Sequence, residues 1–225
     1  MSSSASLLNL IVGFVIAVSL ASCASISEEE CLKGDWFGIG LHDGERGYLL
    51  ERLERHQKAC QRVDVLVDQD AYFKGRFEGL KSYCTPQNAY VLASNGRRYN
   101  DVCPPDLAQG FANGLQVGDR VYDARRTVRR LESSISSTGY TIDANARQID
   151  ELRDRVAFSN DATEKRSLRD EITRLRSTNC TLRRSIASHE RDLRRAERDL
   201  DDIEDWARVR MSELTGIPAV EFPIR

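Results

Sequence analysis

The residues most able to perform chemistry are two histidines, one of which has an acidic neighbour: His42-Asp43 and His56. A histidine paired with a carboxylate can act as a general acid or base. His56 also lies four residues before Cys60, which is one turn of a helix. A free Cys60 thiol would be a nucleophile with His56 as its base, whereas a disulfide at Cys60 would remove that nucleophile.

The chain contains six cysteines. Cys23 follows an apparent export signal and Cys180 stands apart, so the others are available to pair: Cys31, Cys60, Cys84 and Cys103. Four cysteines permit three pairings, and we favour Cys84–Cys103 with Cys31–Cys60. Each bond would contribute about 2–4 kcal/mol. An exported protein favours disulfides over a metal site, and no Cys-x-x-Cys pair is present. We predict no metal and no cofactor.

With Cys60 in a disulfide, His42, Asp43 and His56 still permit a hydrolase. The sequence contains no Gly-x-Ser-x-Gly, no His-Glu-x-x-His and no phosphate-binding loop. We therefore interpret both histidines as structural and keep the hydrolase as the alternative.

These residues lie among three copies of one motif: an aromatic residue, then Gly, Gly and Tyr at steps of three, four and four. The copies are Phe37/Gly40/Gly44/Tyr48, Tyr72/Gly75/Gly79/Tyr83 and Phe111/Gly114/Gly118/Tyr122. Steps of three and four return to one helix face. Gly costs about 1 kcal/mol against Ala in a helix, so a compensating contact is needed. We predict that these glycines seat a second helix or a buried ring. Charged residues between them argue against packing within a bilayer.

Residues 31–122 form the predicted domain that carries this motif. We expect one helix from near Asp35 to about Val63, a second over Gln69–Tyr83, and a third that Pro104-Pro105 opens. Between Cys84 and Cys103 the turn pair Asn95-Gly96 predicts a short β-hairpin or loop.

Residues 123–210 change character, because apolar positions recur at alternating steps of three and four on both sides of a polar turn. The outgoing series is Val128, Leu131, Ile135, Thr138, Ile142, Asn145, Ile149, Leu152 and Val156, and the returning series is Leu168, Ile172, Leu175, Asn179, Leu182, Ile186, His189, Leu193, Ala196, Leu200 and Ile203. This pattern predicts a long antiparallel coiled-coil hairpin. A parallel dimer of long helices is the competing arrangement. Residues 211–225 form an apolar tail.

Residues 1–22 read as a lipoprotein signal peptide. Their apolar run of about 14 residues is shorter than the ~20 that span a bilayer. Leu20-Ala-Ser-Cys23 resembles a bacterial lipobox, so Cys23 is the predicted lipidation site and residues 23–30 the tether. An ordinary secretory signal or a short membrane anchor is the alternative. Ala24 after the cysteine, in place of Asp, favours the outer membrane by resemblance to other lipoproteins.

The net charge of −2, with 30% charged residues, gives no field that would attract nucleic acid. The expected partners are the membrane, through lipid on Cys23, and an envelope protein or a second copy through the coiled coil.

Many spaced residues resemble a known family. They are Cys31, Asp35-Trp36, Gly40-x-x-Asp43-Gly44, Gly47, His56-x-x-x-Cys60, Asp68 or Asp70, Tyr72-x-x-Gly75-x-x-x-Gly79-Leu80-x-x-Tyr83-Cys84, Gly96, Tyr99, Val102-Cys103-Pro104 and Phe111-x-x-Gly114. The set is similar to Gram-negative lipoproteins of domain of unknown function 2799, over about residues 31–122. The resemblance implies an envelope lipoprotein and brings no activity, cofactor or catalytic residue.

The sequence thus predicts a mainly α-helical protein: a small disulfide-stapled domain followed by an antiparallel helical hairpin. The favoured function is a non-enzymatic lipoprotein of the cell envelope with a structural, spacing or protein-binding role in the periplasm. The alternative is a periplasmic hydrolase using His42, Asp43 and His56.

Overall fold

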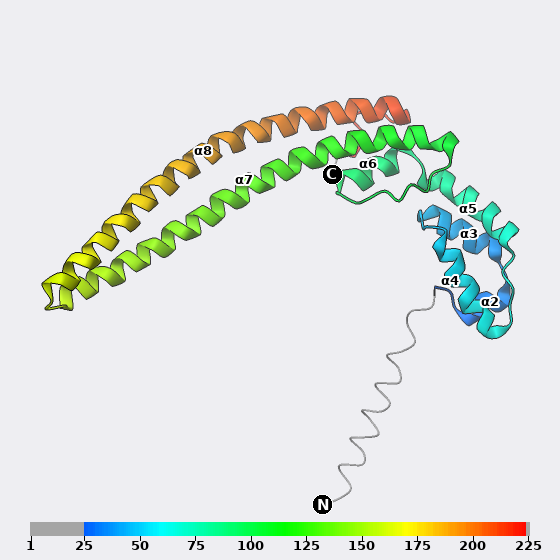
Figure 1. The fold of residues 1–225 in the computed structure, drawn as a ribbon. Coiled ribbons are helices and arrows are strands. Elements are labelled where there is room, and N and C mark those ends of the chain that lie inside the picture. Colours follow the sequence, from blue (N-terminus) through cyan, green and yellow to red (C-terminus); the bar gives the residue numbers. More distant parts are fainter. Residues whose placement is uncertain (1–24, 224–225) are drawn as a thin grey trace, which may run out of the picture. The chain divides into compact units, whose positions relative to one another are not determined.

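The structure, a computed structural model, describes residues 25–223, and those residues form helices without any strand. The helices are α2 (Glu28–Lys33), α3 (Trp36–Glu45), α4 (Glu51–Cys60), a short 3₁₀ helix (Gln61–Val63), α5 (Gln69–Tyr83), α6 (Pro86–Ser94), α7 (Pro105–Phe158) and α8 (Ala162–Thr215), as Figure 1 shows. The predicted signal peptide and the lipidation site Cys23 lie outside the described residues.

The chain divides into two units, which are described separately. The N-terminal unit comprises residues 25–89 with Arg98–Ala112, and the hairpin unit comprises Tyr90–Arg97 with residues 113–223.

Short oxygen-bearing side chains fix where the helices of the N-terminal unit begin. The Ser27 hydroxyl accepts from the Glu30 backbone N–H, and Glu30 in turn accepts from the Ser27 N–H, which is a capping box. Asp35 caps α3 and Asp68 caps α5, each accepting from a backbone N–H three residues on. These caps satisfy backbone donors that the first helical turn leaves without a partner.

Helices α3 and α5 pack backbone to backbone along the glycine faces of the first two motif copies. A Cβ built on Gly40 would lie 2.1 Å from the Tyr72 carbonyl oxygen, and one on Gly75 would lie 2.0 Å from that of Phe37. Gly44 and Gly79 meet the same kind of backbone contact one turn further along each helix. The contacts advance in the same direction on both helices, so the two helices run parallel.

The single helix expected from Asp35 to Val63 is wrong, because the chain turns between α3 and α4. Gly47 has a φ of +62°, a conformation that side chains other than glycine rarely adopt. The ring of Tyr83 occupies the space where a Cβ would stand, with its Cζ 2.3 Å from that position. The ring and the left-handed backbone together require glycine here, and helix α3 ends two residues earlier.

The predicted β-hairpin at Asn95-Gly96 is also wrong. Residues on its amino-terminal side form helix α6, whose first turn is capped by the Thr85 hydroxyl accepting from the Asn88 N–H. Gly96 does turn the chain, at φ +67°, but it follows a helix. The third motif copy supplies the physical reason: Gly118 of α7 admits the backbone of α6, and its Cβ position lies 2.6 Å from the Tyr90 oxygen.

The packing of α6 on α7 repeats the packing of α3 on α5. Gly96 is covered by the ring of Tyr122, just as Gly47 is covered by Tyr83. The two turn glycines are 49 residues apart and the two tyrosines 39 (96 − 47 and 122 − 83). These offsets place Leu92 at the position equivalent to Asp43, and Phe111 at the position equivalent to Tyr72.

Two disulfides staple the N-terminal unit: Cys31–Cys60 and Cys84–Cys103, the pairing favoured from the sequence. The first joins α2 to the end of α4, and both of its cysteines are buried in an apolar cluster with Trp36. The second closes the segment between α5 and α7. Cys180 is free and exposed.

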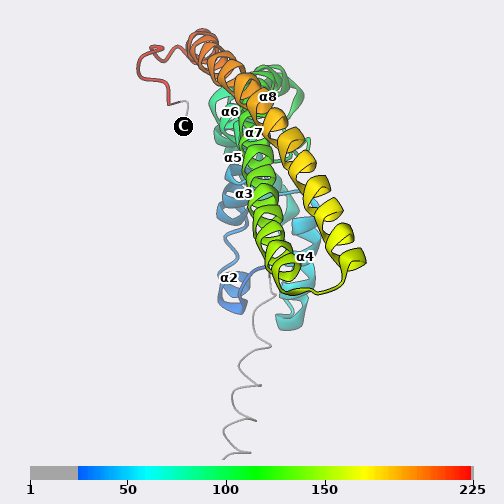
Figure 2. The same ribbon diagram turned by 90° about the vertical axis from the view of Figure 1, so that its left-hand side faces the viewer.

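Helices α7 and α8 form the predicted antiparallel hairpin, and they lie side by side in Figures 1 and 2. Each helix has 54 residues, which corresponds to about 80 Å at 1.5 Å per residue. Near the loop the seam buries Ile149, Leu152, Leu168 and Ile172. Asp161 caps α8 by accepting from the Thr163 N–H.

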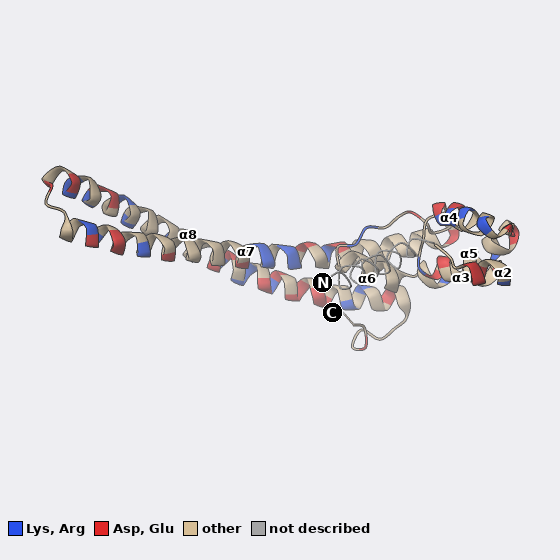
Figure 3. Ribbon diagram, turned by 90° about the horizontal axis from the view of Figure 1, so that it is seen from below, with Lys and Arg blue, Asp and Glu red and all other residues tan. Residues whose placement is uncertain are grey.

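Polar layers interrupt this apolar seam and fix its register. The Asn145 side chain donates to that of Asn179, which is 5% exposed and itself donates to the Ile142 carbonyl. Closer to the open end, Arg125 makes two hydrogen bonds to one carboxylate oxygen of Glu204. Outside the seam, Lys, Arg, Asp and Glu of both signs cover both helices (Figure 3).

The apolar tail after α8 packs on the hairpin unit. Phe222 is 4% exposed and meets the Tyr90 ring edge to face, with Met211 and Val121 in the same cluster. None of the described helices is apolar over a length that could cross a membrane.

Candidate functional site

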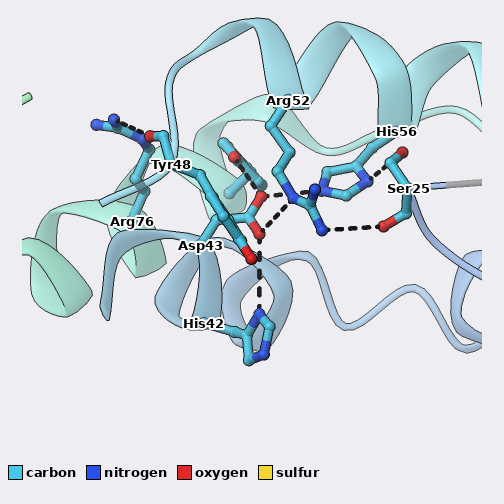
Figure 4. A network of polar contacts seen from close by, with 8 residues as sticks. Ser25, His42, Asp43, Tyr48, Arg52, His56 and Arg76 are labelled. Carbon is cyan, nitrogen blue, oxygen red and sulfur yellow. Dashed lines mark hydrogen bonds and ion pairs between the residues drawn. The ribbon is translucent and has the colours of Figure 1, made fainter. Parts of the chain in front are cut away.

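A buried carboxylate lies where three helices of the N-terminal unit meet. Asp43 of α3 is 1% exposed. Its Oδ2 lies 2.9 Å from Nε2 of His56, on α4, and accepts a 2.8 Å hydrogen bond from the Tyr72 hydroxyl, on α5. Figure 4 shows His56 and Arg52 reaching this carboxylate from α4.

Arg52 connects the buried carboxylate to the start of the described chain. Its Nε donates to Oδ1 of Asp43 at 3.2 Å, and its Nη2 donates to the Ser25 carbonyl at 3.5 Å. The guanidinium lies over the Tyr48 ring, 4.2 Å from the ring centre. Stacking on the ring and two hydrogen bonds hold Arg52 in one orientation.

Ser25 completes the network, because its Oγ lies 2.9 Å from Nδ1 of His56. An ionised carboxylate only accepts hydrogen bonds, so Nε2 of His56 must carry the proton that points to Asp43. In the neutral imidazole Nδ1 is then an acceptor, and the Ser25 hydroxyl donates to it. The hydroxyl of Ser25 thus donates to the imidazole of His56, which donates to the carboxylate of Asp43. A serine hydrolase triad has hydrogen bonds in this same direction.

Opposite pKa shifts keep Asp43 ionised and Tyr72 neutral. Burial raises the pKa of Asp43, but hydrogen bonds from His56 and Tyr72 and the charge of Arg52 outweigh it, so that the pKa lies below its ordinary value of 3.8. Burial, and next the hydrogen bond to Asp43, raise the pKa of Tyr72 well above its ordinary value. Asp43 is therefore an anion at neutral pH and Tyr72 a neutral donor.

Of the three residues predicted from the sequence, the structure brings two into contact. His42 is half exposed, and its Nδ1 lies 3.8 Å from Oδ1 of Asp43, outside hydrogen-bonding distance. Sequence reasoning missed Ser25, Arg52 and Tyr72 as members of the site. Tyr72 begins the second motif copy, which was the one available signal.

A pocket of about 300 Å³ opens beside the network. Its lining includes Ser25, Lys33, His42, Arg52 and His56. In the part of the chain that the structure describes, no three His, Cys, Asp or Glu side chains are grouped so as to hold a metal ion.

Residues 35–120 match a family model described as a protein of unknown function, DUF2799. This segment is a DUF2799 domain. Asp43, Arg52, His56 and Tyr72 all lie inside it, whereas Ser25 precedes it and the far part of the hairpin follows it. No curated protein and no solved structure matches the chain.

The DUF2799 domain does not need the polar network for packing alone. At the equivalent positions in the second helix pair, Leu92 stands for Asp43 and Phe111 for Tyr72, and both are buried. The same glycine and tyrosine packing thus forms around apolar side chains. Burying a carboxylate carries a desolvation cost that Leu92 avoids. The network therefore marks Asp43 and His56 as candidates for a chemical role.

The buried carboxylate of Asp43 makes the free energy of unfolding depend on pH. The folded pKa of Asp43 lies below the ordinary value of 3.8, so its contribution is complete above about pH 4 and is lost as pH falls through the lower, folded pKa. We expect Asp43→Asn to cost about 1–3 kcal/mol at pH 7, because buried donors lose their charged partner. In urea unfolding, the difference in free energy of unfolding between Asp43→Asn and the wild type should become smaller below pH 4. Asp143→Asn, at an exposed position, is the control and should leave the profile unchanged.

Proposed function

We propose that this protein is a lipid-anchored, non-enzymatic component of the cell envelope whose helical hairpin binds or spaces another envelope component. The observation that carries this proposal is the α7–α8 hairpin, with 54 residues in each helix and a seam of defined register. A two-helix arm of about 80 Å offers a long contact surface. Its mixed charges suit a protein surface better than nucleic acid.

The anchor proposed at Cys23 would hold the N-terminal unit close to the membrane. Ser25 is fixed to the unit through His56 and Arg52. Only two residue steps separate it from Cys23, so they span at most about 7 Å. Lipid on Cys23 would therefore bring the unit to the membrane surface. The sequence around Cys23, with Ala24 after it, favours the outer membrane facing the periplasm.

In-membrane photo-crosslinking tests this proposal. A benzoyl-phenylalanine would replace Tyr140 or Phe158, which are 73% and 85% exposed on the hairpin, and Leu66, 91% exposed in the N-terminal unit, as the control position. We expect both hairpin positions to capture the same envelope protein, and Cys23→Ala to abolish both lipid incorporation and capture. An adduct between two copies of the chain would instead show self-association through the hairpin. Capture only from Leu66, or lipid incorporation in Cys23→Ala, would contradict the proposal.

The Asp43–His56 pair supports a second candidate function, a periplasmic hydrolase. Asp43 and His56 are two of the three residues expected from the sequence, and they lie 2.9 Å apart and are both buried. Hydrolysis of a test ester that is lost in His56→Gln, with the fold retained, would establish this function.

A further inference from the structure

We propose that Ser25 is the nucleophile of an ester hydrolase site, with His56 as its base and Asp43 as the orienting carboxylate; this rests on the second candidate function. Ser25 Oγ to His56 Nδ1 and His56 Nε2 to Asp43 Oδ2 are both 2.9 Å. Both are within the hydrogen-bond reach that a nucleophile and its base require. His42, the third residue expected from the sequence, is not part of this series of hydrogen bonds.

The reaction balances with water as the only co-reactant. Ser25 Oγ attacks the ester carbonyl carbon while Nδ1 of His56 takes the hydroxyl proton. The carbon–oxygen bond to the leaving alcohol breaks, and His56 returns the proton to that alcohol. Water, deprotonated by His56, then attacks the acyl–serine. The bond between the acyl carbon and Ser25 Oγ breaks, His56 returns the proton to Oγ, and the acid is released. Asp43 stays ionised and stabilises the imidazolium at both stages.

Arg52 and Tyr72 position these groups. Arg52 binds both the Asp43 carboxylate and the Ser25 carbonyl, so it fixes the nucleophile's backbone relative to the base. Tyr72 and His56 both donate to Oδ2 of Asp43, so Tyr72 restrains the orientation of the Asp43 carboxylate. These constraints act on Ser25 although it lies before helix α2.

One side chain of the pocket, Lys33, favours an ester that carries an anionic group. Each of the pocket's three carboxylates accepts a hydrogen bond from within the chain: Glu30 from the Ser27 N–H, Asp35 from the Gly38 N–H, and Asp43 from the Tyr72 hydroxyl. Lys33 makes no hydrogen bond or ion pair that the structure shows in the described residues, and it lines the same pocket. Lys33 is thus the available cation for the substrate's anionic group. At about 300 Å³ the pocket suits a small ester.

Covalent labelling of the full-length, lipidated protein in detergent tests the nucleophile. A fluorophosphonate should modify Ser25, read by mass spectrometry on the peptide ending at Lys33. We expect full labelling in the wild type and in Ser82→Ala, an exposed serine on α5. No adduct should form on that peptide in Ser25→Ala, and labelling should slow by about 100-fold or more in His56→Gln. Near-UV circular dichroism would show that the variants are folded.

Ester hydrolysis separates this inference from the function on which it rests. The probes are 4-nitrophenyl acetate and the anionic 4-nitrophenyl monoester of succinate. We expect the anionic ester to react at least tenfold faster, and Lys33→Gln to remove that preference. Activity that survives in Ser25→Ala but not in His56→Gln would overturn the role of Ser25 and leave the hydrolase. Absence of both hydrolysis and labelling in the folded wild type would overturn both.

A thiol at this position keeps the inference testable if His56→Gln fails to fold. In Ser25→Cys, proximity to His56 should raise the rate of alkylation at pH 6 at least tenfold above that of the exposed Cys180. Equal rates for the two thiols would contradict activation by His56.

Discussion

Replacing Gly40 with alanine is expected to cost the N-terminal unit about 3 kcal/mol or more, the upper range for overpacking a core. The added methyl group would stand 2.1 Å from a backbone oxygen of α5. A backbone oxygen cannot rotate away as a side chain can, so the two helices would have to separate along all four glycines. Gly75→Ala meets the same obstacle from the other helix, 2.0 Å from an oxygen of α3.

The measurement is urea unfolding followed by the fluorescence of Trp36, which is 5% exposed in the N-terminal unit, in a Trp206→Phe background. Gly139→Ala is the matched control, because no atom lies within 4 Å of its Cβ position in the middle of α7. Alanine should stabilise the hairpin there by up to about 1 kcal/mol. If Gly40→Ala were as harmless as Gly139→Ala, the backbone contact between α3 and α5 would be disproved.

Removing the Cys31–Cys60 disulfide is expected to have the second large effect. The bond joins residues 29 apart in sequence, and its loss should cost about 2–5 kcal/mol. Both sulfurs are buried with Trp36, so the double variant Cys31→Ala with Cys60→Ala also loses packing. The same fluorescence measurement should show a lower urea midpoint.

Cys180→Ala is the control for this second prediction, because Cys180 is exposed and free. It should leave the midpoint within about 0.5 kcal/mol of the wild type. A double variant as stable as Cys180→Ala would show that burial around Trp36 suffices without the covalent link.

The glycine motif predicted a close helix contact because a spacing of four can be read directly from the sequence. It did not predict which helices meet, or that they run parallel. The pairing of the helices depends on the turn at Gly47. The requirement for glycine there is explained only by the ring of Tyr83, 36 residues later, which covers it. The same reasoning explains the error at Asn95-Gly96, where a local turn signal was read without Tyr122. The hairpin was predictable because its periodic pattern is long and its partners are adjacent in the chain.

The candidate site divides in the same way. His56 was predictable as a candidate because the chain has only three histidines, and Asp43 because it adjoins another of them, His42. Arg52 is one of many arginines, and nothing in its neighbours marks it. Ser25 lies in a stretch that resembled a polar tether, and only the fold brings its hydroxyl to His56.

The register of the α7–α8 seam allows the hairpin to change in length only by fixed increments. Seven residues added to each helix would carry the loop outward by about 10 Å and leave every seam residue facing its partner. Unequal additions, or additions of five, would turn Asn145 away from Asn179. A hairpin with this seam therefore lengthens or shortens by whole heptads that are gained or lost in pairs.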